Sequence, residues 1–109
     1  MKNEWILGIN YKKRILLDKI QGKVNLIQEV IISPLGDIPL HKHKSTDEIF
    51  YIISGSPIIK IEDRKKELYP GDIITVEKEI NHGFINESKN EVKLICLKIN
   101  YRDGDSYLG

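Results

Sequence analysis

Residues 36–55 read GDIPLHKHKSTDEIFYIISG, in which two histidines, His41 and His43, are separated by one residue and followed by an apolar run. Residues two apart on an extended strand point to the same face and lie about 6.6 Å apart along it. The imidazoles of His41 and His43 can therefore turn toward one point. The stretch predicts a strand that presents two metal ligands.

A third ligand is needed, because two imidazoles leave a transition metal short of donors. A carboxylate just beyond the turn at 44–46 would supply an anionic ligand. Asp47 and Glu48 both stand at this place. Strand alternation does not choose between them, because the faces of both residues are mostly apolar along 47–53. The residues alone leave the carboxylate open.

The rest of the chain predicts an all-β fold. Of its 109 residues, 20 are Ile and none is Ala, so a β-branched residue abounds and the best helix former is missing. No segment shows sustained helical periodicity. Strands at regular spacing between turn-prone segments predict one antiparallel sandwich or barrel. The apolar runs of strand length are 15–20, 24–33, 48–53, 58–62, 72–76 and 92–99.

Composition and charge exclude several classes of function. The 17 Lys and Arg against 16 Asp and Glu give a formal charge of +1, too little to attract nucleic acid or an anionic membrane surface. The single Cys96 permits neither an intrachain disulfide nor a multi-cysteine zinc site. The sequence contains no signal-peptide core and no apolar window of membrane-span length. We therefore expect a cytoplasmic protein without nucleic-acid or membrane partners.

The opening stretch resembles the first motif of the cupin family, which runs Gly, His-X-His, three or four residues, Glu, six residues, Gly. Gly36, the two histidines, Glu48 and Gly55 occupy these places, with one residue fewer between Gly36 and His41 than in the family pattern. By this resemblance the carboxylate ligand is Glu48.

A second cupin motif runs Gly, five residues, Pro-X-Gly, two residues, His, three residues, Asn. Gly71, His82 and Asn86 stand at the right offsets, but residues 77–79, Glu-Lys-Glu, replace Pro-X-Gly. The turn before His82 must therefore be made by other residues. The resemblance covers about residues 24–99.

The resemblance implies the fold, the site and the partners. It implies an all-β, single-domain cupin over 1–109, a double-stranded β-helix or jelly-roll-like antiparallel barrel, with a motif core of about 24–99. It implies a homodimer, for which the N-terminal strands within 1–23 offer apolar cover. It also implies one divalent transition metal, Fe, Mn, Zn or Ni. The implied metal ligands are His41, His43, Glu48 and His82.

A site of three imidazoles and one carboxylate leaves two positions of an octahedral ion open for water or substrate. We therefore expect a metal-dependent enzyme acting on a small oxygen-bearing metabolite, with dioxygenase-like or isomerase-like chemistry. The alternative is a non-catalytic, metal-containing barrel that binds a small molecule, because the sequence offers no further group as a general base.

Strand alternation predicts a mostly apolar pocket. It places Phe50 beside Glu48, and Phe84 and Asn86 beside His82, so Asn86 is the polar residue expected to support the site. The basic run 11–14 is interpreted as solvated surface. Cys96 is interpreted as an inert buried thiol. Residues 62–67 are interpreted as an exposed hairpin, and residues 100–105 as a polar, mobile end.

Overall fold

Eleven strands and no helix make up residues 4–108, the part of the chain that the computed structural model describes. The ends of the predicted domain, residues 1–3 and 109, lie outside the described residues. The strands are β1 (Ile6–Leu7), β2 (Tyr11–Asp18), β3 (Val24–Ile32), β4 (Asp37–Lys42), β5 (Asp47–Ser54), β6 (Ile58–Ile61), β7 (Arg64–Glu67), β8 (Ile73–Val76), β9 (His82–Ile85), β10 (Val92–Ile99) and β11 (Tyr107–Leu108).

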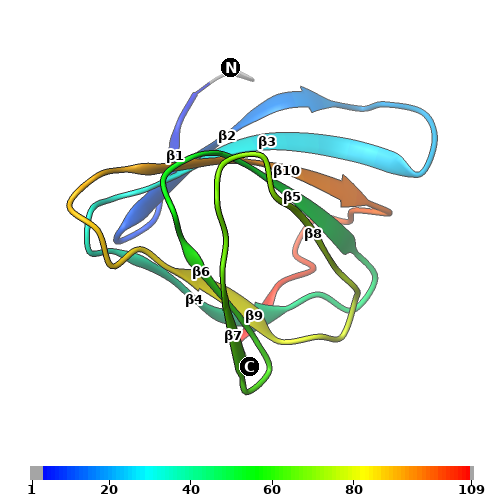
Figure 1. Cartoon of the computed structure of the whole chain (residues 1–109). Coiled ribbons are helices and arrows are strands. Elements are labelled where there is room, and N and C mark those ends of the chain that lie inside the picture. Colours follow the sequence, from blue (N-terminus) through cyan, green and yellow to red (C-terminus); the bar gives the residue numbers. More distant parts are fainter. Residues whose placement is uncertain (1–3, 109) are drawn as a thin grey trace.

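The strands form two facing antiparallel sheets (Figure 1). The first has the order β1-β2-β3-β10-β5-β8, and the second has the order β11-β4-β9-β6-β7. From β3 to β10, consecutive strands alternate between the sheets, except that β6 and β7 both lie in the second sheet. This is the double-stranded β-helix that the sequence predicts.

The central strands β3, β5 and β10 change the character of their inward side chains along their length. Toward one end these side chains are apolar and form the core. Toward the other end Gln28 opposes Cys96, and Glu48 opposes Lys98. The polar ends of three strands therefore meet in one place, and the barrel has an apolar end and a polar end. The buried core consists of Val30, Ile32, Phe50, Ile52, Ile59, Leu68, Val76, Phe84, Val92, Leu94 and Cys96.

The second sheet brings together two segments that carry histidines. Strands β4 and β9 pair with His41 opposite His82, after a register shift between Ile38 and His41. The two strands run very close, because a Cβ atom added at Gly83 would lie 2.5 Å from the Ile38 carbonyl oxygen. Residues 41 and 82 are thus neighbours in space despite their separation in sequence.

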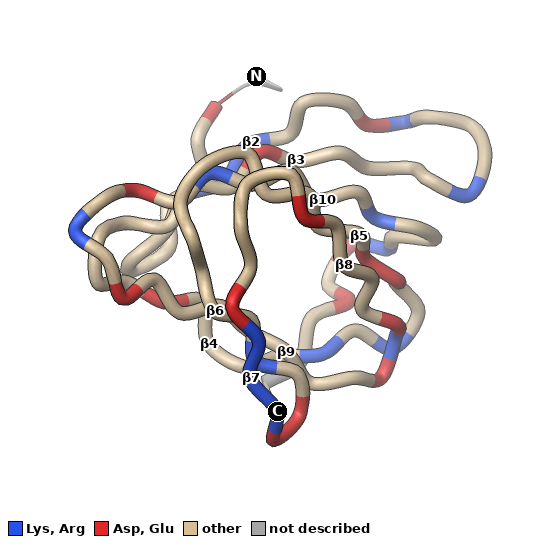
Figure 2. Tube along the Cα trace, in the orientation of Figure 1, with Lys and Arg blue, Asp and Glu red and all other residues tan. Residues whose placement is uncertain are grey.

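The structure confirms the hairpin at 62–67 and corrects two sequence-based expectations. Strands β6 and β7 form the hairpin, and β7 is exposed throughout. Strand β2 begins at Tyr11 and residues 11–14 on it are half-buried, so the basic run is not simply solvated surface. The end of the chain is held, because β11 pairs with β4 and Asp105 is buried. Figure 2 shows most charged residues along the loops and sheet edges, with the strongest clustering on the β7 hairpin.

Candidate metal centre

Four side chains from three strands and a loop converge at the polar end of the barrel. His41 lies on β4, His43 just beyond that strand, Glu48 on β5 and His82 on β9. One potential ligand atom from each residue lies within 4.8 Å of those of the others. All but His41 are buried. The other candidate carboxylate, Asp47, points elsewhere and accepts a hydrogen bond from a backbone N–H.

Each imidazole is oriented by a backbone carbonyl. The Nδ1 atoms of His41 and His82 both lie 2.9 Å from the carbonyl oxygen two residues earlier in the chain. The Nδ1 atom of His43 contacts the Asp105 carbonyl oxygen. An Nδ1–H that donates to a carbonyl leaves the Nε2 lone pair free to bind a metal, and this is the usual way in which metal-ligating histidines are fixed.

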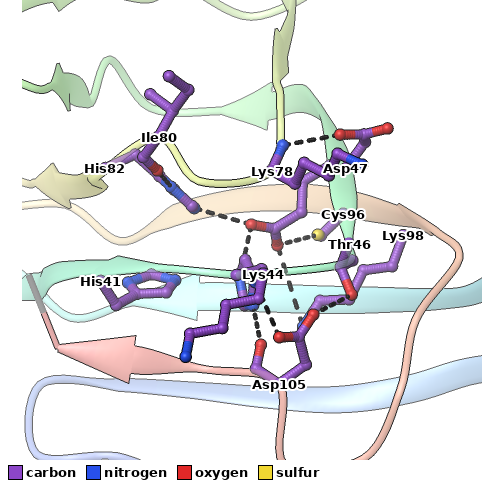
Figure 3. A network of polar contacts seen from close by, with 12 residues as sticks. His41, Lys44, Thr46, Asp47, Lys78, Ile80, His82, Cys96, Lys98 and Asp105 are labelled. Carbon is purple, nitrogen blue, oxygen red and sulfur yellow. Dashed lines mark hydrogen bonds and ion pairs between the residues drawn. The ribbon is translucent and has the colours of Figure 1, made fainter.

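The buried donor atoms fit a cation better than they fit one another. Nε2 of His43 is buried and has no hydrogen-bond partner, although Glu48 Oε1 lies 2.9 Å away. The same carboxylate oxygen lies 2.7 Å from Nε2 of His82 (Figure 3). Both Nε2 atoms thus contact the same carboxylate oxygen. With the proton of each ring on Nδ1, neither Nε2 has a hydrogen to donate to that oxygen. A divalent ion held by all of them would remove the mismatch.

The electrostatics of the site favour a carboxylate and a neutral imidazole. Although burial opposes ionisation, the contacts with His43 and His82 and the charge of Lys98 hold the pKa of Glu48 well below its usual range. Burial lowers the pKa of His41 to about 4. For Glu48 and His41 these are the protonation states that a metal needs, because protons compete for the same lone pairs. Although burial opposes it, the contact with Glu48 raises the pKa of His43, so a metal would have to displace a proton there.

A cavity of about 250 Å³ opens beside the site, and His41, His43 and Glu48 line it. Phe50 and Phe84 form part of its wall, as expected. The pocket is mostly apolar, as expected, but Gln28, Lys13 and Lys98 add a polar part to its wall that the sequence patterns did not predict. Such a space suits a small metabolite rather than a large one.

The cupin-domain family model matches residues 28–98, about two thirds of the chain. The chain belongs to the cupin family. It is 28% identical over 76 residues to an uncharacterized protein of Methanocaldococcus jannaschii, an alignment that covers 70% of this chain and 61% of that protein's length.

Solved structures share the fold of this cupin at low sequence identity. KdgF from a Halomonas species superposes with a TM-score of 0.80 at 20% identity, covering 93% of this chain and 89% of the other. The polyketide cyclase RemF from Streptomyces resistomycificus has a TM-score of 0.77 at 24% identity, with coverage of 92% and 71%. These likenesses establish the architecture.

This cupin makes the turn before His82 without the family's Pro-X-Gly. Glu79 stands at the place of the glycine and has a φ of 70°, a left-handed conformation that favours glycine. Its N–H donates to the His43 carbonyl at 2.6 Å. This hydrogen bond connects the loop that carries His43 to the turn that precedes β9, the strand of His82.

Asn86 does not support the metal centre as expected. Its side-chain amide donates to the backbone carbonyls of Ile32, Ser33 and Asn90, and its oxygen accepts from Ser88. These hydrogen bonds hold the loop that follows β9, at residues 86–90. Cys96 is buried as expected, but its thiol donates to Glu48 Oε2 at 3.1 Å. Burial raises the pKa of Cys96 well above its usual range, so the thiol stays protonated.

Sequence reasoning missed Asp105, which supports the site from the end of the chain. Its carboxylate accepts hydrogen bonds from the N–H groups of Lys44 and Ser45 and from the hydroxyls of Ser45 and Thr46. Burial opposes its charge, but these bonds lower the pKa of Asp105 well below its usual range. The loop between the His-X-His pair and Glu48 is thus held by a carboxylate that no motif includes.

Proposed function

We propose that this cupin is a metal-dependent enzyme that acts on a small oxygen-bearing metabolite, with His41, His43, Glu48 and His82 holding one divalent transition metal. The convergence of these four donors beside a cavity of about 250 Å³ carries the proposal. The name of the polyketide cyclase shows that the same fold serves an enzyme elsewhere.

The bound ion would supply Lewis-acid or redox chemistry at the inner end of the cavity. The protein would fix its geometry through the carbonyls that orient the imidazoles and through the thiol of Cys96 on Glu48. Phe50 and Phe84 would limit the water around a substrate. Dioxygenase-like and isomerase-like reactions both suit this arrangement, and the identity of the ion separates them.

The test is a comparison of turnover between metal-loaded forms of the protein. Iron-, manganese-, nickel- and zinc-loaded protein is assayed for oxygen consumption and for isomerisation with hydroxy-ketones, diols and 2-oxo acids. The proposal expects turnover with at least one ion, and none for His82→Ala carrying the same ion in solution. Binding of these compounds without turnover in any form would contradict catalysis and support the non-catalytic binding barrel.

We also propose that two copies associate through the outer face of the six-stranded sheet. Apolar side chains at both edges of this face are exposed, with Leu7 on β1 at 76% and Ile73 on β8 at 65%. Ile9, beside β1, is 96% exposed. Exposed apolar area of this kind commonly marks an interface. Light scattering should give twice the chain mass, and Leu7→Glu with Ile73→Lys should give a monomer. A monomeric wild type would contradict the dimer.

A further inference from the structure

The cavity beside the metal centre has a cationic wall that none of the four candidate ligands forms. Lys98 on β10 is 6% exposed, and its ammonium lies 3.9 Å from Glu48 Oε2, beyond hydrogen-bond distance. Its other neighbour is the ring of Tyr101, whose centre is 5.1 Å away. An ammonium carries three N–H donors, and burial without acceptors is costly. Lys98 therefore has donors available for something in the cavity.

A second ammonium faces the same space. Lys13 on β2 lines the cavity, and no described carboxylate forms an ion pair with it. Burial and the neighbouring charge of Lys98 lower the pKa of Lys13. Its neighbours Lys12 and Arg14 point to the opposite face of the strand, where both lie over the ring of Trp5. Of the three basic residues in this run, Lys13 alone points into the cavity, where Lys98 supplies a second positive charge.

A third group completes this wall. Gln28 on β3 is 5% exposed and lines the cavity, and among the described residues its side-chain amide has no hydrogen-bond partner. Its side-chain amide can therefore donate to a ligand in the cavity. Gln28 is opposite Cys96 across the sheet, one inward position from Lys98 on the neighbouring strand.

The charges of the cavity favour an anion. The ammonium groups of Lys13 and Lys98 balance the carboxylates of Glu48 and Asp105, all of which line the space. A divalent ion on the candidate ligands would leave two positive charges uncompensated within walls that are partly apolar. Charges in such surroundings interact much more strongly than in water.

We propose that this cupin recognises a small organic acid, whose carboxylate binds Lys13, Lys98 and Gln28 while its oxygen-bearing carbon faces the metal centre. This inference rests on the proposed function and names its substrate class. A carboxylate suits these donors better than a phosphate does, because the wall has no arginine and Glu48 lies 3.9 Å from one of its two lysines. The cavity volume of about 250 Å³ favours a small acid.

The test compares acids with their uncharged amides. Binding of pyruvate, 2-oxobutanoate and lactate, and of the three matching amides, is measured by calorimetry with metal-free and zinc-loaded protein. Wild type should bind at least one acid tenfold more tightly than its amide in both forms. Lys13→Met and Gln28→Leu should each abolish most of this preference, whereas Lys12→Met on the outer face should retain it. Equal binding of every acid and its amide would overturn the inference, as would an unchanged preference in Lys13→Met.

Two further readouts separate this inference from the proposed function and from a phosphate ligand. Metal content is measured on the same samples. Wild type that takes up no zinc on incubation but still prefers acids, with the preference lost in Lys13→Met, would contradict the metalloenzyme and support the carboxylate site. Wild type that holds metal but binds acids and amides equally would support the metal site and overturn the carboxylate site. Inorganic phosphate that binds more tightly than every acid would overturn the choice of a carboxylate.

Discussion

At the scale of single residues, the centre depends on atoms that the motifs do not contain. The motifs name the three histidines and Glu48, and the structure brings these four together. Backbone carbonyls orient the imidazoles, and the carbonyl that contacts His43 belongs to Asp105, 62 residues farther along the chain. Sequence patterns predict residue types at fixed spacing, but they do not predict which carbonyl will face a ring.

Lys98 could have been predicted from the sequence. It continues the inward alternation of Val92, Leu94 and Cys96 on β10, all of which are buried. Lys13 was harder to place, because it stands in a run of charged residues of which only alternate members turn inward. For Gln28 and Asp105 no local signal distinguishes a lining residue from a surface one.

Glu79 provides a test of backbone strain at the turn that replaces Pro-X-Gly. Its φ of 70° disfavours a residue with a Cβ atom, and glycine adopts it freely. Glu79→Gly should therefore raise the free energy of unfolding by about 0.5–1 kcal/mol in a urea titration. Glu77→Gly, at a neighbouring position without positive φ, is the control and should not stabilise the protein. A loss of stability in Glu79→Gly would contradict this account of the turn.

Asp105 makes stability depend on pH in a predictable direction. Its folded pKa lies below the ordinary value of 3.8, so its contribution is present above about pH 4 and is lost as the pH falls through the folded pKa. Asp105→Asn should cost about 2 kcal/mol near neutral pH, because its amide cannot accept all four hydrogen bonds.

The measurement for Asp105 is urea unfolding of metal-free wild type and variant from pH 7 to pH 2. Groups that the two proteins share cancel in the difference between them. That difference should be constant above pH 5 and shrink below pH 4. A difference that grows on acidification would show that the loop is not held by the ionised carboxylate.

At the scale of elements, the register between β4 and β9 sets the site. The periodicity of apolar residues located the long strands well, and the structure has a strand at each predicted run. Strands β4 and β9 have weaker patterns, because β4 carries Pro39 and a shift in register, and β9 has only four residues. Tertiary contact with the rest of the barrel decides their conformation.

Gly83 tests whether this close pairing positions the histidines. A Cβ atom there would lie 2.5 Å from the Ile38 carbonyl oxygen and 3.1 Å from the Leu40 nitrogen, both of which are backbone atoms. Gly83→Ala should push β4 away from β9 and weaken zinc binding by about tenfold or more. Gly22→Ala, at a position with open space around it, should cost stability alone. Equal zinc affinity in Gly83→Ala and wild type would contradict this role for the pairing.

At the scale of the whole molecule, two sheets bring distant segments to one end of a barrel. Composition and charge pointed to a single β domain without a nucleic-acid partner, and the cupin motifs gave the architecture. The described residues contain no helix long and apolar enough to span a membrane. The polar wall of the cavity arises only when β2, β3 and β10 lie side by side, so it could not be read from any one segment.

The most direct test of this account is the metal content of the protein purified without a metal-affinity tag. Elemental analysis should find about one equivalent of a divalent transition metal per chain. The variant with His41, His43 and His82 replaced by Ala should hold none while remaining folded by circular dichroism. Wild type that stays empty after incubation with manganese, iron, nickel and zinc, or a variant that retains its metal, would contradict the central claim.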